Sequence, residues 1–369
     1  MSEVRYGLVG AGYFGLAIGR ALLKEPSSSI TRVFDPENSA NAALVLGAEV
    51  SASIEELCAS EDVDAVIVAS PNWAHAEAVL VAARHGKHVF CEKPIALSYE
   101  DCSRMLTETA RAGVLFMAGH AMNFMAGVRR AKALIAEGAI GEVVFCRAVR
   151  NNWEEPQEEV TWKKRRELSG GHLYHHIHEL DFVQSIMGPA VTATMAGGNV
   201  AHLGPGHGNE DDLLLITLEF GNNTFAALEY GSAFRWPEHY VLIEGTKGAI
   251  RIDLQDTGVE VRAPGGTEFS LLHRSQAEDD DRTTFYNRGA ADGGVLFGNP
   301  SIEPPLWLRG MIEEELSYFH SLLRGEPAMV EFAALTDGSA AAASIATADA
   351  LSLSLREGRK VLISEIAGR

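Results

Sequence analysis

Three glycines near the start of the chain constrain its fold more than any other feature. The apolar run Val4 to Gly10 leads into the spacing G-x-G-x-x-G at Gly10, Gly12 and Gly15, followed by the helix-like run FGLAIGRALLKE. In a strand-turn-helix unit, the first glycine permits a tight turn, the second lets backbone approach a pyrophosphate, and the third lets the helix pack closely on the strand. Unpaired N–H groups at the helix N-terminus then face the phosphates. The sequence therefore predicts a Rossmann dinucleotide-binding domain at this end.

An acidic residue follows at the distance expected for ribose recognition. The next apolar run, SITRVFD, ends in Asp35, 20 positions beyond Gly15. A carboxylate there accepts hydrogen bonds from the adenosine ribose and repels a 2′-phosphate. Pro36 follows where an NADP-binding chain often carries a phosphate donor. We therefore expect NAD rather than NADP, with Tyr13 and Phe14 of the glycine turn also beside it.

Strand and helix patterns alternate up to about residue 120. Val63 to Ser70 is typical of a buried strand, a helix is expected from about His75 to His85, and the strand-like run KHVFCEKP follows. Ligands of parallel sheets bind beyond the carboxyl ends of the strands. The residues expected at the cofactor there are Ser70, Pro71, Asn72, His75, Glu92 and Lys93.

Size and charge narrow the remaining possibilities. A chain of 369 residues is long enough for two hydrophobic cores. Its net charge of -19 disfavours nucleic acid and anionic membrane as partners, because both are themselves negative. No export signal and no apolar run of membrane-spanning length is visible. The four cysteines are scattered, as expected for reduced thiols in a cytoplasmic protein.

Beyond about residue 120 the pattern changes to short β-rich runs joined by tight turns. Hairpins are predicted around Asn222-Asn223 and around Thr246 to Gly248. We expect an α/β domain over residues 1–120, followed over residues 121–369 by an α+β domain with a large, mostly antiparallel open sheet. The second domain is expected to bind substrate and to mediate oligomerisation. Its C-terminal helix is expected to pack back on the first domain.

Several of these motifs together resemble the Gfo/Idh/MocA family of NAD(P)-dependent oxidoreductases. The motifs are GLVGAGYFG, Asp35, the Pro71-Asn72 turn with His75, and above all CEKPIALS, Cys91 to Ser98. The resemblance continues through the second domain to the C-terminus. Members mostly interconvert hydroxyl and carbonyl groups on sugars, inositols and related polyols.

The resemblance carries expectations for the site and the assembly. It implies that the Lys93 ammonium hydrogen-bonds the reacting oxygen beside the nicotinamide, and that Glu92 and Pro94 shape the turn. It also implies a homodimer or homotetramer, because an open antiparallel sheet face commonly pairs with another subunit.

Four histidines fall within seven residues of the second domain, after Gly170-Gly171. They are His172, His175, His176 and His178. The family pattern here is Gly-Gly, then Asp-x-Gly-x-His-x-x-Asp, to which His178 and Asp181 correspond. Tyr174 stands at the usual catalytic Asp and His176 at the usual Gly. The resemblance therefore implies His178 as general acid or base, with Tyr174 replacing the aspartate as hydrogen-bond donor or orienting His178.

A metal site is a second interpretation of the cluster. On a continuous helix, His175, His178 and Glu179 are neighbours, and imidazoles with a carboxylate suit Zn or Mn. The family chemistry needs no metal, so we favour histidines that line a pocket. The residues expected at substrate are Lys93, Asn123, Trp153, Lys163, Tyr174, His175, His176, His178 and Asp181.

These features indicate an NAD-dependent oxidoreductase acting on a carbohydrate or polyol. Two alternatives remain open: a lyase or glycoside-cleaving enzyme that uses bound NAD in a transient redox cycle, and a non-catalytic NAD-sensing regulator. The loss of the usual aspartate and the extra histidines motivate the first. The -19 charge favours a neutral polyol, unless the basic run Lys163 to Arg166 faces the cleft.

Overall fold

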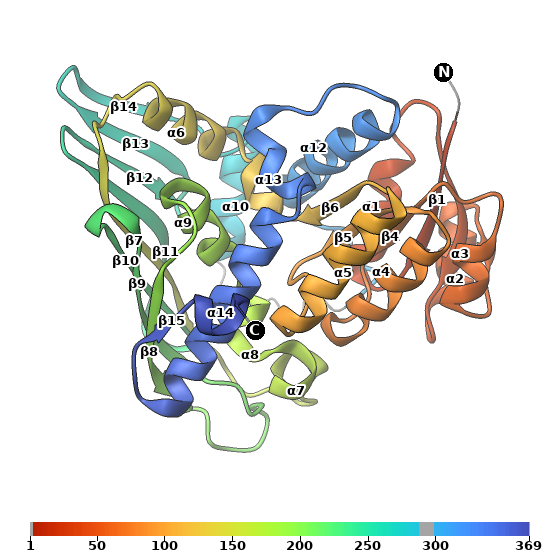
Figure 1. Ribbon diagram of the computed structural model, residues 1–369, viewed down its shortest axis with the longest axis horizontal. Helices are drawn as coiled ribbons and strands as arrows, with labels where there is room; N and C mark the ends of the chain where they lie inside the picture. Colours follow the sequence, from red (N-terminus) through yellow and green to blue (C-terminus); the bar gives the residue numbers. More distant parts are fainter. Residues whose placement is uncertain (1–2, 288–298, 369) are drawn as a thin grey trace. The chain divides into compact units, whose positions relative to one another are not determined.

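The computed structural model describes residues 3–287 and 299–368 (Figure 1). These residues form two compact units, each built around one β-sheet. The first unit comprises the described residues of Met1–Ala121, Gly293–Pro304 and Leu308–Ala342; the second comprises those of Met122–Asp292, Pro305–Trp307 and Ala343–Arg369.

The first unit contains a six-stranded parallel sheet with the strand order β3-β2-β1-β4-β5-β6. Its strands are β1 (Val4–Val9), β2 (Ser28–Phe34), β3 (Glu49–Val50), β4 (Ala65–Val68), β5 (His88–Glu92) and β6 (Phe116–Gly119). The connecting helices are α1 (Tyr13–Leu22), α2 (Ser39–Leu46), α3 (Ile54–Ala59), α4 (His75–Arg84) and α5 (Tyr99–Ala112). This confirms the predicted Rossmann fold, and in the register Val9 is opposite both Phe34 and Val68.

Helix α12 (Leu306–Leu323) contributes its residues from Leu308 onward to this same unit. Phe319 packs against Tyr6 of β1 and Phe90 of β5, with ring centroids 6.4 and 5.7 Å apart. The next residue, His320, bonds the Tyr6 hydroxyl through Nδ1 at 2.7 Å. Two short helical segments follow, η5 (Val330–Phe332) and α13 (Ala333–Thr336). The core of the first unit thus includes side chains from the far end of the sequence.

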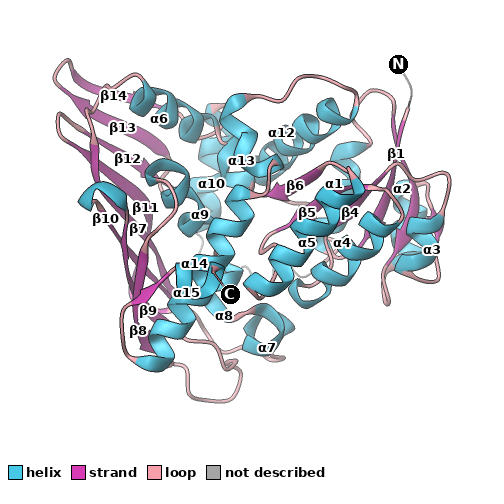
Figure 2. Ribbon diagram, in the orientation of Figure 1, coloured by secondary structure: helices cyan, strands magenta, loops and turns pink. Residues whose placement is uncertain are grey.

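The second unit contains a nine-stranded sheet with the order β14-β13-β12-β11-β7-β10-β9-β8-β15 (Figure 2). The strands are β7 (Val143–Trp153), β8 (Thr192–Gly198), β9 (Leu213–Glu219), β10 (Phe225–Gly231), β11 (Ala233–Gly245), β12 (Ala249–Asp253), β13 (Gly258–Ala263), β14 (Gly266–Ser270) and β15 (Val361–Leu362). Among the described pairs only β7 with β10 is parallel. The mostly antiparallel sheet is as predicted, and β9 with β10 and β11 with β12 form the two expected hairpins.

The second unit also contains the helices α6 (Ala126–Ala136), α7 (Arg166–Ser169), α8 (Gly171–His175), α9 (His178–Met187), α10 (Gln276–Asn287), α14 (Ser339–Glu357, from Ala343) and α15 (Ser364–Ala367). Of these, α6, α8, α9 and α14 contact strands of the sheet, whereas α7 packs against α8. Inward strand positions such as Cys146, Leu228 and Ile250 are fully or almost fully buried. On the opposite face Leu215 and Phe225 are exposed. Pairing of this face with a second subunit stays a prediction.

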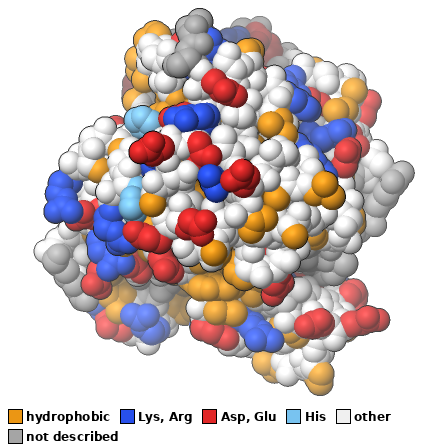
Figure 3. Space-filling model, turned by 90° about the vertical axis from the view of Figure 1, so that its right-hand side faces the viewer, with side chains coloured by type: hydrophobic (Ala, Val, Ile, Leu, Met, Phe, Trp, Pro, Cys, Tyr) orange, Lys and Arg blue, Asp and Glu red, His pale blue; other side chains and the backbone are white. Residues whose placement is uncertain are grey.

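Surface charge, helix hydropathy and the cysteines can be compared with what the composition predicts. The face drawn in Figure 3 carries acidic side chains interspersed with basic ones rather than a broad basic area. In the described part of the chain, no helix is both long and apolar enough to cross a bilayer. The four cysteines are buried, and no disulfide joins them in the described structure.

Candidate active site

The glycine turn leaves room for a ligand at one of its three glycines. Gly10 has φ +92°, and a Cβ there would lie 2.3 Å from the backbone nitrogen of Ser70. A Cβ on Gly15 would lie 1.9 Å from the Gly10 carbonyl oxygen, so α1 packs closely on β1 only with glycine at this position. Gly12, the residue before α1, has nothing within 4 Å of its Cβ position. This open space at a helix N-terminus fits a pyrophosphate.

Asp35 lies beside this turn, at the end of β2. Its Oδ2 accepts the Ala11 backbone N–H at 2.7 Å, and its Oδ1 accepts those of Glu37 and Asn38 at 2.9 and 2.8 Å. Three backbone donors thus fix the carboxylate next to the glycines. Its position suits hydrogen bonds from a ribose, as predicted for NAD.

His75 joins the turns that follow β4 and β5. Its ring lies 2.8 Å from two backbone carbonyls, with Nδ1 at Pro94 O and Nε2 at Ser70 O. Burial lowers the pKa of His75, and a neutral imidazole donates only one N–H, so one carbonyl receives the hydrogen bond at a time. His75 was expected at the cofactor. In the structure both ring nitrogens lie at backbone carbonyls, and a contact of His75 with the cofactor stays a prediction.

His75→Ala is expected to loosen both turns. We expect the free energy of unfolding to fall by about 1–3 kcal/mol, because the substitution leaves buried carbonyls without a partner. NADH affinity should fall several-fold in a fluorescence titration. His85→Ala is the matched control, since His85 follows the same helix and pairs with Glu55 at the surface. Equal behaviour of the two variants would contradict this role for His75.

Glu92 ends β5, and Lys93 and Pro94 form the turn that follows it. The Lys93–Pro94 peptide bond is cis. Glu92 Oε2 accepts the Lys93 backbone N–H at 3.2 Å. The other cofactor candidates differ in exposure: Tyr13 and Asn72 are buried, whereas Phe14 and Ser70 are partly exposed.

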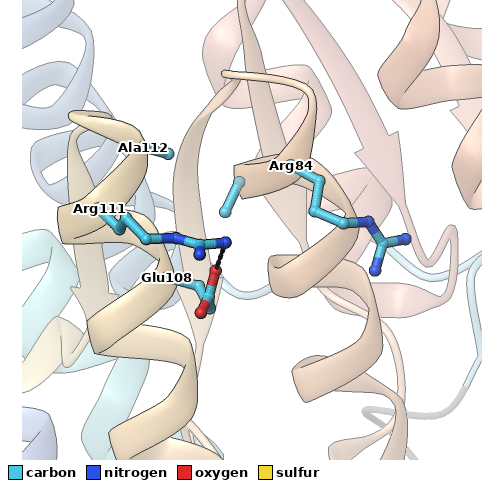
Figure 4. Close-up of a pocket in the computed structure, with 5 residues that line it drawn as sticks. Arg84, Glu108, Arg111 and Ala112 are labelled. Carbon is cyan, nitrogen blue, oxygen red and sulfur yellow. Dashed lines mark ion pairs between the residues drawn. The ribbon is translucent and has the colours of Figure 1, made fainter.

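A shallow pocket elsewhere on the first unit is lined by Ala83, Arg84, Glu108, Arg111 and Ala112 (Figure 4). The ion pair between Arg111 and Glu108 forms part of its wall. These residues lie near the carboxyl ends of α4 and α5. Such helix ends lie at the amino ends of the strands, the edge opposite the glycine turn, so we do not assign this pocket to the cofactor.

In the second unit the histidine-rich segment is two short helices rather than one. Helix α8 ends at His175 and α9 begins at His178, with His176 in a non-helical conformation between them. Three of the four histidines nevertheless lie close together. The His176 ring lies 4.4 Å from that of His172 and 4.8 Å from that of His175, centroid to centroid.

The members of the cluster differ in their surroundings. His175, His176 and His178 are partly exposed, as a pocket lining requires. His172 is 4% exposed, and neither of its ring nitrogens has a hydrogen-bond partner among the described residues. Burial, with the nearby Lys164 and Arg150, lowers the pKa of His172 well below the ordinary value. His172 is therefore held in its neutral form.

The Tyr174 side chain is engaged with another part of the second unit. Its side chain is buried, and the hydroxyl donates to a carboxylate oxygen of Asp349 on α14. Burial and this carboxylate raise the pKa of Tyr174 well above its ordinary value. The observed contact anchors α8 to α14.

Asp181 and Asn123 form a buried network. The Asn123 side-chain amide donates to Asp181 Oδ2 at 3.1 Å, and the Ser344 hydroxyl donates to Oδ1 at 3.0 Å. Lys132 donates to the Asn123 oxygen at 2.6 Å. The Asp181 carboxylate is thus buried and held by Asn123 and Ser344, and its expected contact with substrate stays a prediction.

Glu179 is committed to an ion-pair network instead of a metal. Its Oε1 accepts from Arg150 at 3.1 Å and from His239 at 2.7 Å. Burial alone would raise the pKa of Glu179, but Arg150 and His239 lower it. In the described ranges no three His, Cys, Asp or Glu side chains form a metal-ligating group. The alternative site at His175, His178 and Glu179 is therefore not assembled.

The basic run turns one lysine inward. Lys164 Nζ contacts Glu154 and Glu210 at 2.5 and 2.9 Å, and all three side chains are largely buried. Lys163, the expected pocket residue, is partly exposed, while Arg165 and Arg166 are exposed. The Trp153 ring lies against that of His202, with centroids 4.8 Å apart and the planes tilted by 56°.

Several of these partners were missed from sequence. Arg150 and His239 occupy inward positions of β7 and β11. A charged or polar residue at an inward position of a strand pattern could have identified them as members of a buried polar network. Asp349 and Glu210 offered no such signal. Lys93 belongs to the first unit and His178 to the second. That they meet at one substrate stays a prediction.

Two family models cover almost the whole chain. Residues 4–120 match the NAD-binding Rossmann fold of the Gfo/Idh/MocA oxidoreductases, and residues 132–363 match their C-terminal alpha/beta domain. The chain belongs to the Gfo/Idh/MocA oxidoreductase family. Its first domain is accordingly an NAD-binding domain, in agreement with the open space at Gly12 and the position of Asp35.

Full-length relatives and solved structures extend this assignment. The chain is 52% identical over 369 residues to a 2,7-anhydro-N-acetylneuraminate hydratase of Mediterraneibacter gnavus, covering 100% of this chain and 99% of that protein. It is 51% identical to the Escherichia coli protein of the same name, covering 98% of each. The fold matches levoglucosan dehydrogenase in complex with NADH and levoglucosan, with a TM-score of 0.78, 21% identity and coverage of 98% and 100%.

Proposed function

We propose that this Gfo/Idh/MocA protein is a hydratase of 2,7-anhydro-N-acetylneuraminate that holds NAD through a transient redox cycle. The observation that carries the proposal is the identity of 51–52% to two hydratases of this name along essentially the whole of each chain. Opening an anhydro bond with water involves no net oxidation, although this chain has an oxidoreductase fold. Any hydride taken from the substrate must therefore return to it.

The chain's own residues suit such a cycle. Bound NAD accepts and returns a hydride. Lys93, in the turn after β5, holds the reacting oxygen and stabilises charge there. His178 takes and returns a proton, since its ring is partly exposed at the start of α9. Tyr174, bonded to Asp349, cannot serve as the usual carboxylate base, so the acid-base work falls on histidine.

An anionic substrate needs a cation at the site, and the basic run Lys163 to Arg166 offers one. A neuraminate carries a carboxylate, whereas the net charge of -19 favours a neutral polyol. The charge of Lys164 is balanced by Glu154 and Glu210, so Lys164 has little attraction left for a ligand. Lys163 is the member of the run that we assign to the substrate carboxylate.

The proposal is tested by product analysis with purified protein, NAD and the 2,7-anhydro sugar acid. We expect N-acetylneuraminate to form without a net rise in absorbance from NADH. Catalytic amounts of NAD should suffice for many turnovers. Stoichiometric NADH with a polyol or sugar instead would assign the chain to the net dehydrogenases of its family. No turnover of the anhydro sugar under either condition would contradict the proposal.

A further inference from the structure

Helix α12 buries a carboxyl group without a partner in the first unit. Glu315 is 1% exposed, and neither of its carboxyl oxygens has a hydrogen-bond partner among the described residues. Its neighbour Glu313 pairs with Lys24 at 2.5 Å, at a partly exposed position. A buried carboxyl that lacks a partner costs stability. A group retained at such a cost calls for a functional explanation.

Helix and strand periodicity place Glu315 next to Glu92. Phe319 of α12 packs on Phe90 of β5, with ring centroids 5.7 Å apart. Glu315 lies one helical turn before Phe319, about 6 Å along the helix axis. Glu92 lies two residues after Phe90 on the same face of the strand, about 6.6 Å along it. Glu92 also acts electrostatically on Glu315, which agrees with both carboxyl groups lying near this end of β5.

The opposite face of β5 is occupied by other groups. Cys91, between Phe90 and Glu92, is fully buried toward Cys102 of α5. Glu92 is thus the residue at the end of β5 that faces α12. Its Oε2 also accepts the Lys93 N–H, so the carboxyl pair lies directly below the lysine turn.

Two carboxylates in this place cannot both keep a negative charge at low cost. Burial, reinforced by Glu92, raises the pKa of Glu315 well above its ordinary value. Burial also raises the pKa of Glu92, but Lys93 and His120 oppose that rise. Further along α12, His320 is engaged by Tyr6. Of the described residues, no cation is found to act on Glu315.

We propose that Glu315 is a positioning residue that stays protonated in the folded enzyme and leaves Glu92 as the charged carboxyl of the pair, beside Lys93. The inference rests on the proposed function, which assigns Lys93 to the reacting oxygen. A neutral acid near Glu92 adds no second negative charge beneath the lysine turn. A second charge would draw the Lys93 ammonium toward the protein and away from substrate.

The protonation state is tested by stability, with Glu315→Gln and the matched control Glu313→Gln. Below the ordinary pKa of glutamate both folded and unfolded chains carry the Glu315 proton. Above it the unfolded chain loses the proton and the folded chain keeps it, so stability falls as pH rises toward the raised folded pKa. We compare the Tm of Glu315→Gln with that of wild type at each pH. We expect this difference to grow in favour of the variant by at least about 3 °C as the pH rises from 4.5 to 8. A Tm difference that does not change with pH would overturn the proposal.

Infrared spectroscopy gives a second readout of the same proton. The C=O stretch of a protonated carboxyl should be present at pH 8 in wild type and in Glu313→Gln, and absent in Glu315→Gln. Both measurements are made without substrate, so they remain decisive even if the protein does not hydrate the anhydro sugar. A spectrum of Glu315→Gln identical to that of wild type would also overturn the assignment.

The positioning role is tested by comparing Glu315→Gln with Glu315→Leu. Glutamine keeps a neutral donor of similar size, whereas leucine removes it. We expect Glu315→Leu to lower kcat about tenfold relative to Glu315→Gln with KM little changed, and to weaken NADH binding in a titration without substrate. Equal kcat and equal NADH affinity in these two variants would refute the positioning role.

Discussion

Lys93→Ala should lower kcat/KM by about 10²–10³-fold or more, because the variant lacks the cation that stabilises charge on the reacting oxygen. NADH affinity should change only a few-fold. Gly12 and Asp35, which we assign to the pyrophosphate and the ribose, follow the strands β1 and β2 rather than β5, which precedes Lys93. Product formation and NADH titration on the same sample measure the two effects.

Lys87→Ala is the control for this variant. Lys87 directly precedes the same strand at its other end, where Nζ donates to the carbonyls of Ser60 and Val63. Its loss should lower the melting temperature and leave kcat unchanged. If Lys93→Ala kept full biological function with intact NAD binding, the protein would be an NAD-sensing regulator and both enzymatic proposals would fail.

His178→Gln should lower kcat by about 10²–10⁴-fold, the usual contribution of a general acid or base. The variant should also lose the limb of the pH profile that reports an imidazole. This limb is expected to fall with decreasing pH, since a base must be unprotonated to accept the hydroxyl proton. The profile of kcat against pH, measured for product formation, checks both statements.

His172→Gln is the informative comparison. Burial and nearby cations keep His172 neutral across the working range, so this residue cannot supply the titrating limb. Its substitution should affect stability and leave the pH limb in place. Loss of the limb in His172→Gln, with its retention in His178→Gln, would transfer the acid-base role within the cluster.

The nucleotide half of the site was predictable because its determinants are local. Gly10, Gly12 and Gly15 meet steric demands within one turn, and Asp35 follows at the length of one βα unit. The antiparallel character of the second domain was equally visible in its short alternating runs. In each case the signal and its cause lie within a few tens of residues.

The substrate half was less predictable because its partners are distant in sequence. The sequence favoured a continuous helix through His172 to His178, but the helix is interrupted at His176. Tyr174 meets Asp349, which lies 175 positions away. Glu315 gave no sequence signal at all, since its meaning depends on a strand more than 200 residues earlier. A sequence shows which side chains are present, whereas contacts between residues far apart in the sequence become visible only in the structure.

The contribution of α12 to the first unit also bears on how the chain is made. Tyr6 and Phe90 stay uncovered until Phe319 and His320 have been synthesised. A ribosome that has released the residues of the Rossmann sheet therefore carries an incomplete core, with apolar surface open to aggregation. We therefore expect the first unit to complete its core only after nearly the whole chain has emerged. An expression fragment that ends near residue 120 lacks this cover, so cofactor binding should be studied in the full chain.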